Sequence, residues 1–454
     1  MKQRKRRFET LVFYNHTGIE RHLEKMAKQG WLIEKISNEF WTYRRIEPAD
    51  LTFTVTYYPL ASEFDPEYSE PQKRLHDFCA DTGWKLACTW FQMQVFYNEE
   101  KDPTPINTDP VLEVDSIHRA CKANFLRGFF IIGTVAAVLS FFFLSSLISD
   151  TLRLLASPTN LFKGFCFLSL FLLCGVELFI YFRWYRKAKK AAAHEIFLDT
   201  PSTEKFQKTV VVLLLIFVAL WISDTILTGN RILLILILLM FLVIQLQQLL
   251  MIKVKESMKK RKVTKGTNRT LTFIFGFLFA FIMFSFINLG GSRFFENDIR
   301  ENLPEYSTIT PITMADVIPD APYTYFKQKD FEESSLLTMI EIEYKPSRTE
   351  ELIDSIPVME YQLILPASPA FHGFFENQMK RLIVLSEFWK GNLIETDPNP
   401  WNAEHAYRLF LDDGTETNRY LVCYKDLLAD LQFSWEPTAE QKNTVSQKLD
   451  MTTW

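Results

Sequence analysis

The side chains most able to do chemistry are scattered along this chain of 454 residues rather than gathered into a motif. The sequence contains no H-E-x-x-H, G-x-S-x-G or G-x-x-x-x-G-K-[ST] segment and no glycine-rich phosphate loop. Its seven histidines are dispersed, and none of its six cysteines forms a C-x-x-C pair. Isolated cysteines are typical of small buried hydrophobic residues rather than of metal sites or disulfide frameworks. We therefore expect a protein that is not an enzyme and that holds no metal and no cofactor.

Polar residues inside long apolar segments are the second set of candidates, because ionisable groups at mid-membrane mark ion and substrate pathways. Glu177 lies six residues before Arg183, about 9 Å from the end of its segment at 1.5 Å per residue. We expect it to reach the inner interface or to pair with a basic loop residue. Asp224 lies near the other end of its own segment. Neither carboxylate is central, so the pattern does not favour a transporter.

Gln245 and Gln248 are three residues apart in the fourth apolar segment, which places them on one helical face. Amides inside an apolar helix commonly hydrogen-bond across to a neighbouring helix. We expect this structural role for both.

Five segments of roughly twenty apolar residues occupy the middle of the chain, and each is long enough to cross a hydrocarbon core of about 30 Å. They are residues 125–148, 161–182, 209–227, 232–252 and 271–289. A soluble domain would have to bury all five without a polar face. The sequence thus predicts a multi-pass α-helical membrane protein with five transmembrane helices flanked by two soluble α+β domains.

The basic residues predict the orientation, because Lys and Arg in short loops stay on the cytoplasmic side. The connections after the second and fourth apolar segments are rich in Lys and Arg, whereas the other two carry one Arg each. No secretory signal starts the chain, since the apolar run after KQRKRR is too short. We expect the cell membrane as the location, with the N-terminus cytoplasmic and everything after Leu289 extracytoplasmic.

The same basic segments suggest partners. Lysines and arginines beside a bilayer attract anionic lipid head groups, at about 1 kcal/mol per charge. No recognition helix or ribonucleoprotein motif accompanies them, so nucleic acid is not expected. The lipid bilayer is the one partner that the sequence indicates, and a protein partner or small ligand is left unidentified.

Three regions follow from these patterns: a cytoplasmic domain at 1–124, a transmembrane region at 125–290 and an acidic extracytoplasmic domain at 291–454. The first region can be divided into two strand–helix–strand–strand units. The predicted elements are 8–14, 17–30, 31–37 and 40–46 in the first unit, and 51–59, 69–83, 84–90 and 93–99 in the second.

A Gly-Trp pair follows the helix in each unit, as Gly30-Trp31 and Gly83-Trp84. Glycine can take the left-handed conformation that ends a helix. The tryptophan then opens the next strand, where its ring can seal the helix against the sheet. We interpret the region as one βαββ unit used twice, with Gly-Trp as the corner of each copy.

This region also resembles a family of bacterial membrane proteins that carry the domain of unknown function numbered 2812. The resemblance covers about residues 8–98 and rests on HLEKMAKQGWLIEKISNEFWTYRR, FTVTYYP and RLHDFCADTGWKLACTWFQMQVFYN. Where the family usually has Trp-Leu in the first helix, this chain has His22-Leu23. The resemblance implies a multi-pass membrane protein of Gram-positive bacteria, often encoded near PadR-type regulators. It implies no activity and no catalytic residues.

Some small-molecule sensors also contain a duplicated βαββ unit and bind their ligand between the two halves, although this is an analogy of fold only. Aromatic residues suited to such a groove are Trp41, Tyr43, Tyr57, Phe91 and Phe96. At strand spacing the same residues also suit a hydrophobic core, and the sequence leaves both interpretations open.

The last region carries 28 Asp and Glu against 14 Lys and Arg, which argues against a nucleic-acid partner. We expect strands at 335–345 and 359–366, a helix at 370–389, and a hairpin over 406–426 that turns at DDGT. Asp412 and Asp413 lack the spaced oxygen ligands of a calcium loop. Thr438 and Gln441 form a capping box for a terminal helix, and 307–330 is expected to be the juxtamembrane wall of the domain.

These expectations combine into a functional hypothesis. Two folded domains on opposite sides of a bilayer, without a catalytic motif, suit a membrane sensor or regulatory protein that couples the outer domain to the cytoplasmic one. The alternative is an accessory subunit of a transport or export system.

Overall fold

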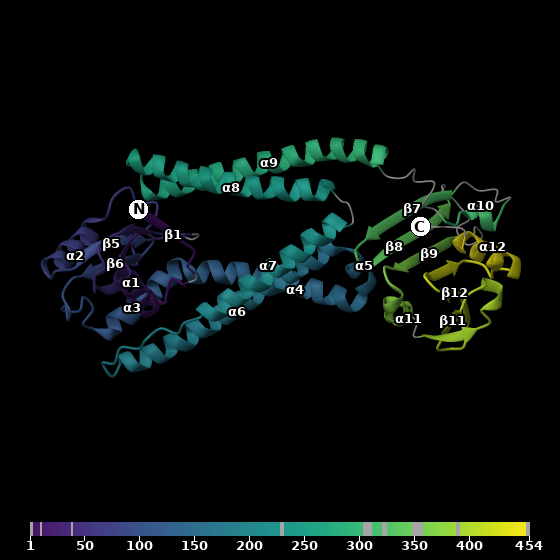
Figure 1. The fold of residues 1–454 in the computed structure, drawn as a ribbon, viewed down its shortest axis with the longest axis horizontal. Helices are drawn as coiled ribbons and strands as arrows, with labels where there is room; N and C mark the ends of the chain where they lie inside the picture. Colours follow the sequence, from purple (N-terminus) through teal and green to yellow (C-terminus); the bar gives the residue numbers. More distant parts are fainter. Residues whose placement is uncertain are drawn as a thin grey trace. The chain divides into compact units, whose positions relative to one another are not determined.

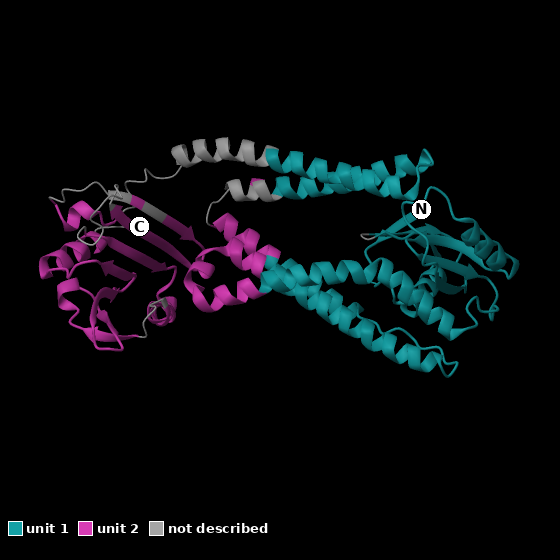
Figure 2. Cartoon of the chain, turned by 180° about the vertical axis from the view of Figure 1, so that it is seen from behind, with its two compact units in different colours: residues 1–140, 165–217, 238–285 teal, residues 141–164, 218–237, 286–454 magenta. Residues whose placement is uncertain are grey.

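The structure is a computed structural model that describes residues 3–9, 11–37, 40–227, 231–302, 311–319, 325–346, 357–386 and 391–450. The chain divides into two compact units (Figure 2). Unit 1 comprises residues 1–140, 165–217 and 238–285, and unit 2 comprises residues 141–164, 218–237 and 286–454.

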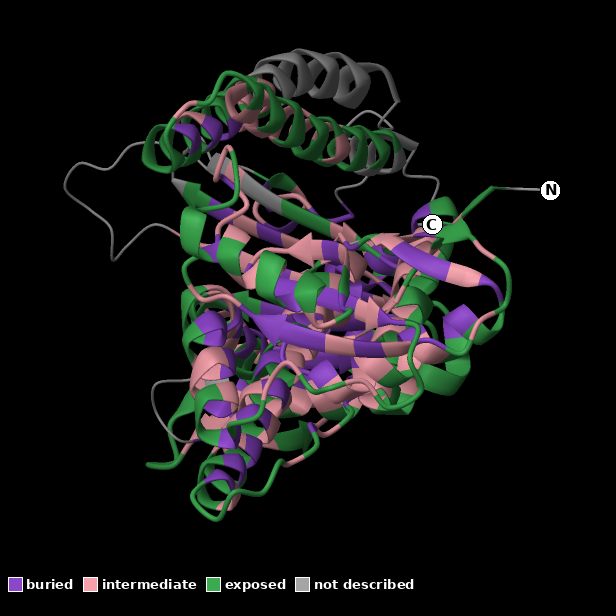
Figure 3. Ribbon diagram, turned by 90° about the vertical axis from the view of Figure 1, so that its left-hand side faces the viewer, coloured by how far each residue is buried: buried purple, intermediate pink, exposed green. Residues whose placement is uncertain are grey.

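Among the described residues, five helices are long and apolar enough to cross a membrane, as the sequence predicts. They are α4 (Phe125–Ser149), α6 (Pro158–Ala192), α7 (Glu204–Leu227), α8 (Arg231–Lys260) and α9 (Lys265–Asn302) (Figure 1). Several extend past the predicted apolar segments, because the flanking Lys, Arg and Ala are good helix formers. Figure 3 shows that buried residues concentrate in the sheets, while the long helices are largely exposed or intermediate. The predicted connection at 228–230 lies outside the described residues.

Residues 3–98, the front domain, form two three-stranded antiparallel sheets with one helix each. The first sheet contains β1 (Arg4–Arg7), β2 (Trp31–Lys35) and β3 (Trp41–Arg45), and the second contains β4 (Thr52–Tyr57), β5 (Lys85–Trp90) and β6 (Met93–Asn98). Their strand orders are β1-β3-β2 and β4-β6-β5. Helix α1 (His16–Lys28) precedes β2, and helix α2 (Glu70–Asp81) precedes β5.

The strand predicted at 8–14 is wrong. The first strand is β1, where Arg4–Arg7 pairs with β3 in the register Arg4↔Arg44 to Arg7↔Trp41. The apolar residues that suggested a strand, Val12, Phe13 and Tyr14, are buried in the connection that follows. Their hydrophobicity reflects burial rather than strand pairing, which a short apolar run cannot distinguish.

The two sheets share local detail beyond their strand order. Gly30 and Gly83 follow the two helices with φ angles of +80° and +85°. The register between the second and third strands then shifts after Ile33 in one sheet and after Leu86 in the other. Counted from each glycine, both shifts fall at the same position. Trp84 is buried with Cys79 of α2 and Phe96 of β6, so its ring packs between helix and sheet as expected, and its Nε1 donates to the Thr104 carbonyl, 2.8 Å away.

Trp31 behaves differently from its counterpart. It is half-buried, and its ring lies beneath two cations, with Lys5 Nζ 5.3 Å and Arg45 Cζ 5.0 Å from the centroid. The first corner is therefore stabilised by cation–π contacts as well as by packing.

The front domain packs against the long helices of unit 1 in a continuous hydrophobic core. Helix α3 (Pro110–Ala123) contributes Ile117 and Cys121 to this core, and α6 contributes Tyr181, Trp184 and Ala188. The acidic side chain of Asp109 caps α3 by accepting from the Val111 amide, 2.7 Å away.

Unit 2 is built around a seven-stranded antiparallel sheet. We call this sheet, together with the helices that cover it, the rear domain. Its strand order is β10-β11-β12-β13-β9-β8-β7. The strands are β7 (Tyr325–Glu333), β8 (Leu337–Pro346), β9 (Met359–Pro366), β10 (Gly391–Thr396), β11 (His405–Leu411), β12 (Glu416–Cys423) and β13 (Leu428–Phe433).

Both faces of this sheet carry a hydrophobic core. Tyr420 and Val422 lie in one core with α10 (Met314–Val317) and α12 (Ala439–Asp450). Their neighbours Leu421 and Cys423 lie in the other, with α5 (Thr151–Ala156) and α11 (His372–Ser386). This alternation follows the two-residue period of a strand.

The predicted elements of this region are largely present. Strands β8 and β9 match the two predicted strands, and β11 and β12 form the predicted hairpin, with Gly414 at φ +84° in its turn. The capping box is present, since the Gln441 amide donates to Thr438 Oγ1 over 3.2 Å and the Thr438 amide donates to Gln441 Oε1 over 3.0 Å. Parts of two predicted segments, 307–310 with 320–324 and the helix end at 387–389, lie outside the described residues.

Replacing Gly30 by alanine is expected to destabilise the front domain. A residue with a Cβ pays roughly 1–2 kcal/mol for a left-handed conformation, and this Cβ would stand 2.9 Å from the Ile46 carbonyl oxygen. Gly83→Ala meets only the movable Asn98 side chain, at 3.2 Å, and should be milder. Gly175→Ala in α6 meets no atom within 4 Å and serves as the control. Thermal unfolding midpoints of the purified variants check the order, and a Gly30→Ala midpoint equal to that of the control would contradict it.

Candidate functional site

A buried carboxylate joins the front domain to two of the long helices. Glu177 of α6 has no exposed surface. Its Oε2 accepts from the Tyr14 hydroxyl at 3.3 Å, and its Oε1 accepts from Gln207 Nε2 of α7 at 2.7 Å. A buried carboxylate without such donors would be strongly destabilising. The three side chains therefore join the connection between β1 and α1 to helices α6 and α7. We call Tyr14, Glu177 and Gln207 the Glu177 junction.

Among the described residues, Glu177 forms no ion pair with the expected basic loop residue, and its partners are Tyr14 and Gln207 instead. Tyr14 is itself fully buried, with its ring stacked on Trp184 and edge-on to Tyr181. Burial and the neighbouring Glu177 carboxylate raise the pKa of Tyr14 far above its usual range. The tyrosine is thus a fixed neutral donor, suited to holding the carboxylate rather than to exchanging protons.

A second polar contact lies beside the first, at the start of α1. Asn15 Oδ1 caps the helix by accepting from the Gly18 amide at 3.0 Å and also accepts from Thr200 Oγ1 at 2.7 Å. The Thr200 amide donates to Thr17 Oγ1 over 3.1 Å. Thr200 precedes α7, so the beginning of α1 is tied to the connection between α6 and α7.

Three titratable groups surround the same end of α1. His16 Nε2 lies 3.5 Å from Glu113 Oε1 of α3, and Glu20 Oε1 accepts from the Val55 amide at 2.8 Å. Burial raises the pKa of Glu20 to about 7, although His16 and the Val55 amide oppose the shift. Burial also disfavours the charged form of His16, but Glu113 and Glu20 outweigh it and raise the pKa of this imidazole. No group of three or more His, Cys, Asp or Glu in the described part of the chain is arranged to hold a metal ion.

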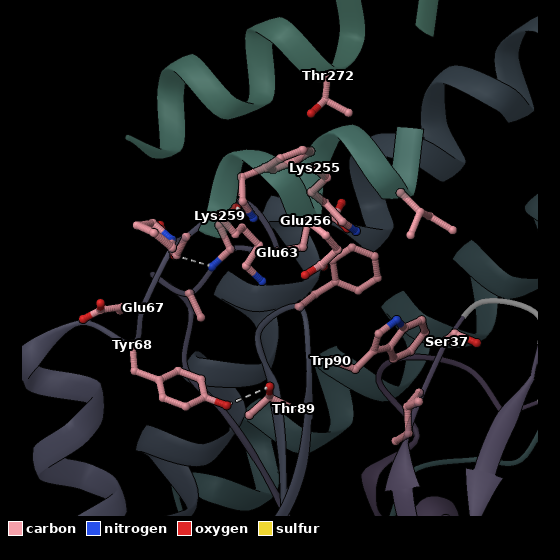
Figure 4. A pocket seen from close by; sticks show the side chains of 18 of the residues that line it. Ser37, Glu63, Glu67, Tyr68, Thr89, Trp90, Lys255, Glu256, Lys259 and Thr272 are labelled. Atoms are coloured by element: carbon pink, nitrogen blue, oxygen red, sulfur yellow. Dashed lines mark hydrogen bonds and ion pairs between the residues drawn. The ribbon is translucent and has the colours of Figure 1, made fainter. Parts of the chain in front are cut away.

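A cavity of about 1070 Å³ lies elsewhere in unit 1, between the front domain and the α8–α9 pair. Figure 4 shows Lys255, Glu256 and Lys259 of α8 gathered with Glu63 and Trp90 of the front domain. Its apolar lining includes Phe64, Phe91, Met251, Ile252 and Phe273.

Residues 60–67, between β4 and α2, form part of the wall of this cavity. We call this segment the acidic loop. Its carboxylates reach the α8–α9 turn in three ion pairs: Glu63–Lys255 at 2.7 Å, Glu67–Lys262 at 2.7 Å and Asp65–Lys265 at 3.7 Å.

One residue of α9 fixes the acidic loop more firmly. Asn268 is fully buried, and its Nδ2 donates to the Phe64 carbonyl at 3.2 Å and to the Lys255 carbonyl at 3.3 Å. Its Oδ1 accepts from Thr272 Oγ1 at 3.2 Å. Exposed ion pairs such as Glu67–Lys262 contribute at most about 1 kcal/mol each, so the buried amide and the partly buried Glu63–Lys255 pair are the firmer polar anchors of the loop.

The five aromatic residues for which a groove and a hydrophobic core were both left open are mostly core residues. Trp41, Tyr43, Tyr57 and Phe96 are buried in the hydrophobic cores. The hydroxyls of the two tyrosines are used internally, since Tyr43 Oη lies 3.1 Å from His22 Nε2 and Tyr57 donates to the Phe13 carbonyl over 2.5 Å. Phe91 differs, because it lines the cavity.

The remaining polar candidates also find distinct surroundings. Asp224 of α7 belongs to unit 2, where its Oδ1 accepts from the Ser335 amide at 2.8 Å. Gln248 lines the cavity, and Gln245 is half-buried. The hydrogen bond expected between neighbouring helices is made by Gln247, whose Nε2 donates to the Gly276 carbonyl over 3.3 Å. All six cysteines are free, five are buried and Cys166 is intermediate.

Unit 2 contains a comparable junction at the start of the rear sheet. Arg153 of α5 lies 3.3 Å from Asp330 and also pairs with Glu341. Leu152 and Ala156 of the same short helix are buried against Met339 in the sheet core.

The most informative residues missed in the sequence were Tyr14, Gln207 and Asn268. Each is one polar atom in an ordinary context, and its partner lies far away in the chain. The acidic loop did offer a signal in the sequence, because Glu63, Asp65 and Glu67 stand at every second position. The segment that joins the fourth and fifth apolar segments is correspondingly rich in lysine.

The stability of the front domain is expected to fall as the pH rises from about 4.5 to about 7. The folded pKa of Glu20, about 7, exceeds its ordinary value of 4.5, so the folded state binds more protons in this window. The raised pKa of His16 acts in the same direction. Glu20→Gln keeps an acceptor for Val55 and should flatten the decline. Glu24→Gln, one turn along α1, is the control. Melting curves from pH 4.5 to 8 check this, and equal slopes in wild type and Glu20→Gln would contradict it.

Comparison with known proteins yields one similarity. No curated protein and no solved structure matches the chain. The region matched by a family model extends past the two sheets, through α3 and into the first turns of α4. That region also contains Tyr14's neighbours Asn15, His16 and Glu113. Residues 15–130 match the model of the family described as Protein of unknown function (DUF2812), in agreement with the resemblance of the N-terminal region to that family.

Proposed function

We propose that this protein is a non-enzymatic sensor or regulatory component of the cell membrane. It would couple an extracytoplasmic rear domain to a cytoplasmic front domain through the long helices. The observation that carries the proposal is that one helix, α7, makes polar contacts within each of the two compact units.

Near its beginning, α7 is linked to the front domain through Glu177 of α6. Gln207 donates to Glu177, which also accepts from Tyr14. Near its end, Asp224 accepts from the Ser335 amide beside strand β8. Between Gln207 and Asp224, α7 is mainly apolar, and the helix is long enough to cross a hydrocarbon core of about 30 Å.

Aromatic contacts pack the second half of α7 against the first turns of α6. Phe165 stacks on Phe217 with ring centroids 4.4 Å apart, and Phe162 stacks on Trp221 at the same separation. Trp221 Nε1 also donates to Thr159 Oγ1 over 3.3 Å. A displacement of one helix would therefore be shared by the other, which suits transmission of a signal along their axis.

The proposed membrane location rests on the five apolar helices and on their exposed side chains. Large apolar residues such as Phe141, Leu215, Phe241 and Phe277 are mostly exposed. Exposed apolar surface on this scale is unfavourable in water and typical of contact with lipid or protein. The basic connections support a cytoplasmic front domain, because Lys and Arg in short loops favour the cytoplasmic side.

We also propose that the front domain is a duplicated βαββ unit. The equal strand orders, the left-handed glycines and the equivalent register shifts support this proposal. A two-fold repeated unit gives the domain two equivalent sheets, of which the second carries the acidic loop between β4 and α2.

Cysteine labelling tests the topology on which the proposal depends. The native cysteines are not exposed, so one exposed cysteine can be added to each domain by Lys101→Cys and Lys425→Cys. A membrane-impermeant maleimide should label Lys425→Cys in intact cells and Lys101→Cys only after permeabilisation. The wild type is the control for background labelling.

The opposite result has a definite meaning. Labelling of Lys425→Cys only after permeabilisation would place both domains in the cytoplasm and would overturn the transmembrane sensor. A membrane-anchored accessory subunit of a transport or export system would then be the better account.

A further inference from the structure

We infer that the cavity beside the acidic loop binds an amphiphile with one anionic head group and an alkyl chain. The inference names a ligand class for the proposed sensor and rests on that proposal. It differs from general attraction of lipid head groups to basic loops, because it assigns a built site with separate places for head and chain.

The size of the cavity suits such a ligand. Its volume of about 1070 Å³ lies at the upper end of the range of small-molecule sites, roughly 300–1,000 Å³. Its walls come from the front domain on one side and from α8 and α9 on the other.

The lining of α8 changes character along the helix. Gln248, Met251 and Ile252 are followed on the same face by Lys255 and Lys259. The helix thus presents an apolar surface that becomes cationic about one turn further on. Phe273 of α9 and Phe64 of the acidic loop, with ring centroids 6.1 Å apart, add aromatic surface beside the apolar part. An alkyl chain would lie there.

The charges of the lining favour an anion at the other end. The carboxylates of the acidic loop are already neutralised, because Glu63 pairs with Lys255 and the other two pair with lysines of the α8–α9 turn. Lys259 is half-buried at the cavity, and no ion pair involving it is found among the described residues. Lys35 adds a second cation and Glu256 one exposed anion. The unpaired charge therefore has a net positive sign, centred on Lys259.

The site would bind both the head group and the alkyl chain of the ligand. A phosphate or carboxylate would accept from Lys259, and the chain would cover Met251 and Ile252. An amphiphile of this kind could come from two sources: it could be a lipid of the surrounding bilayer or a free amphiphile from the cytoplasm. Since the acidic loop closes the cavity through Asn268 and Lys255, occupancy would alter the contact between the front domain and α8–α9.

The test uses the full chain in nanodiscs of neutral lipid, with dodecyl phosphate as the probe. Dodecanol lacks the anion, and inorganic phosphate lacks the chain. We expect dodecyl phosphate alone to bind saturably. Lys259→Gln should weaken its binding about tenfold, as expected for loss of one charge-assisted contact of about 1.4 kcal/mol. Lys260→Gln is the matched control, since Lys260 is exposed and does not line the cavity.

Two results would overturn the site. One is equal binding of dodecyl phosphate and dodecanol, and the other is equal weakening by Lys259→Gln and Lys260→Gln. Melting curves of both variants confirm that each is folded. Ile252→Glu, placed where the chain would lie, gives an independent reading and should abolish binding of dodecyl phosphate.

Further arms distinguish the sources and separate this inference from the proposed function. Native mass spectrometry after exchange into anionic nanodiscs should show a lipid retained by wild type and lost in Lys259→Gln if the source is the bilayer. Binding of the free probe without a retained lipid would indicate a cytoplasmic source. Hydrogen exchange of the rear domain, measured with and without dodecyl phosphate, then addresses signalling. Binding that leaves the rear domain unchanged would uphold the site and contradict the sensor.

Discussion

The burial of the Glu177 carboxylate is the constraint on which the architecture of unit 1 depends. A polar side chain with no exposed surface needs hydrogen-bond partners inside the protein. Glu177 finds them in Tyr14 and Gln207, which come from a strand connection and from another helix. Each partner must therefore be held in place by its own surroundings, and the stacking of Tyr14 on Trp184 and the contacts of Thr200 with Asn15 do this. The front domain is consequently fixed to α6 and α7 rather than tethered beside them.

A second attachment has a different character. The acidic loop meets α8 and α9 through exposed ion pairs, the partly buried Glu63–Lys255 pair and one buried amide, Asn268. Exposed ion pairs are weak and sensitive to salt. This attachment can therefore open more easily than the Glu177 junction. A domain held firmly to one helix pair and loosely to another has a natural direction of movement. The cavity lies at the loosely held side.

Much of the fold could be predicted from the sequence where a pattern is local. Hydrophobic length gave the five long helices, two-residue alternation gave β8 and β9, and Gly30 and Gly83 marked helix ends. Prediction failed where buried apolar residues lie outside a strand or helix. Val12 to Tyr14 are apolar because they fill a core, and the neighbouring strand is the strongly basic Arg4–Arg7.

The candidate site was harder to predict, for a physical reason. Glu177 could be singled out because carboxylates are rare in apolar helices and usually have a functional role where they occur. Its partners could not, since Tyr14 and Gln207 are far from it in the chain and each contributes a single polar atom. The aromatic residues proposed for a groove show the converse difficulty. Strand spacing gives Trp41 and Phe91 equal standing, but the first lies in the core and the second at the cavity.

The central claim is that the Glu177 junction is coupled through α7 to the rear domain, and hydrogen exchange of the full chain in nanodiscs tests it most directly. Gln207→Leu removes the donor that α7 provides to Glu177, and Gln247→Leu removes a comparable interhelical donor from α8. The account predicts faster exchange in β8, next to Ser335, for Gln207→Leu but not for Gln247→Leu. Faster exchange confined to the front domain in Gln207→Leu, with β8 unchanged, would contradict the coupling.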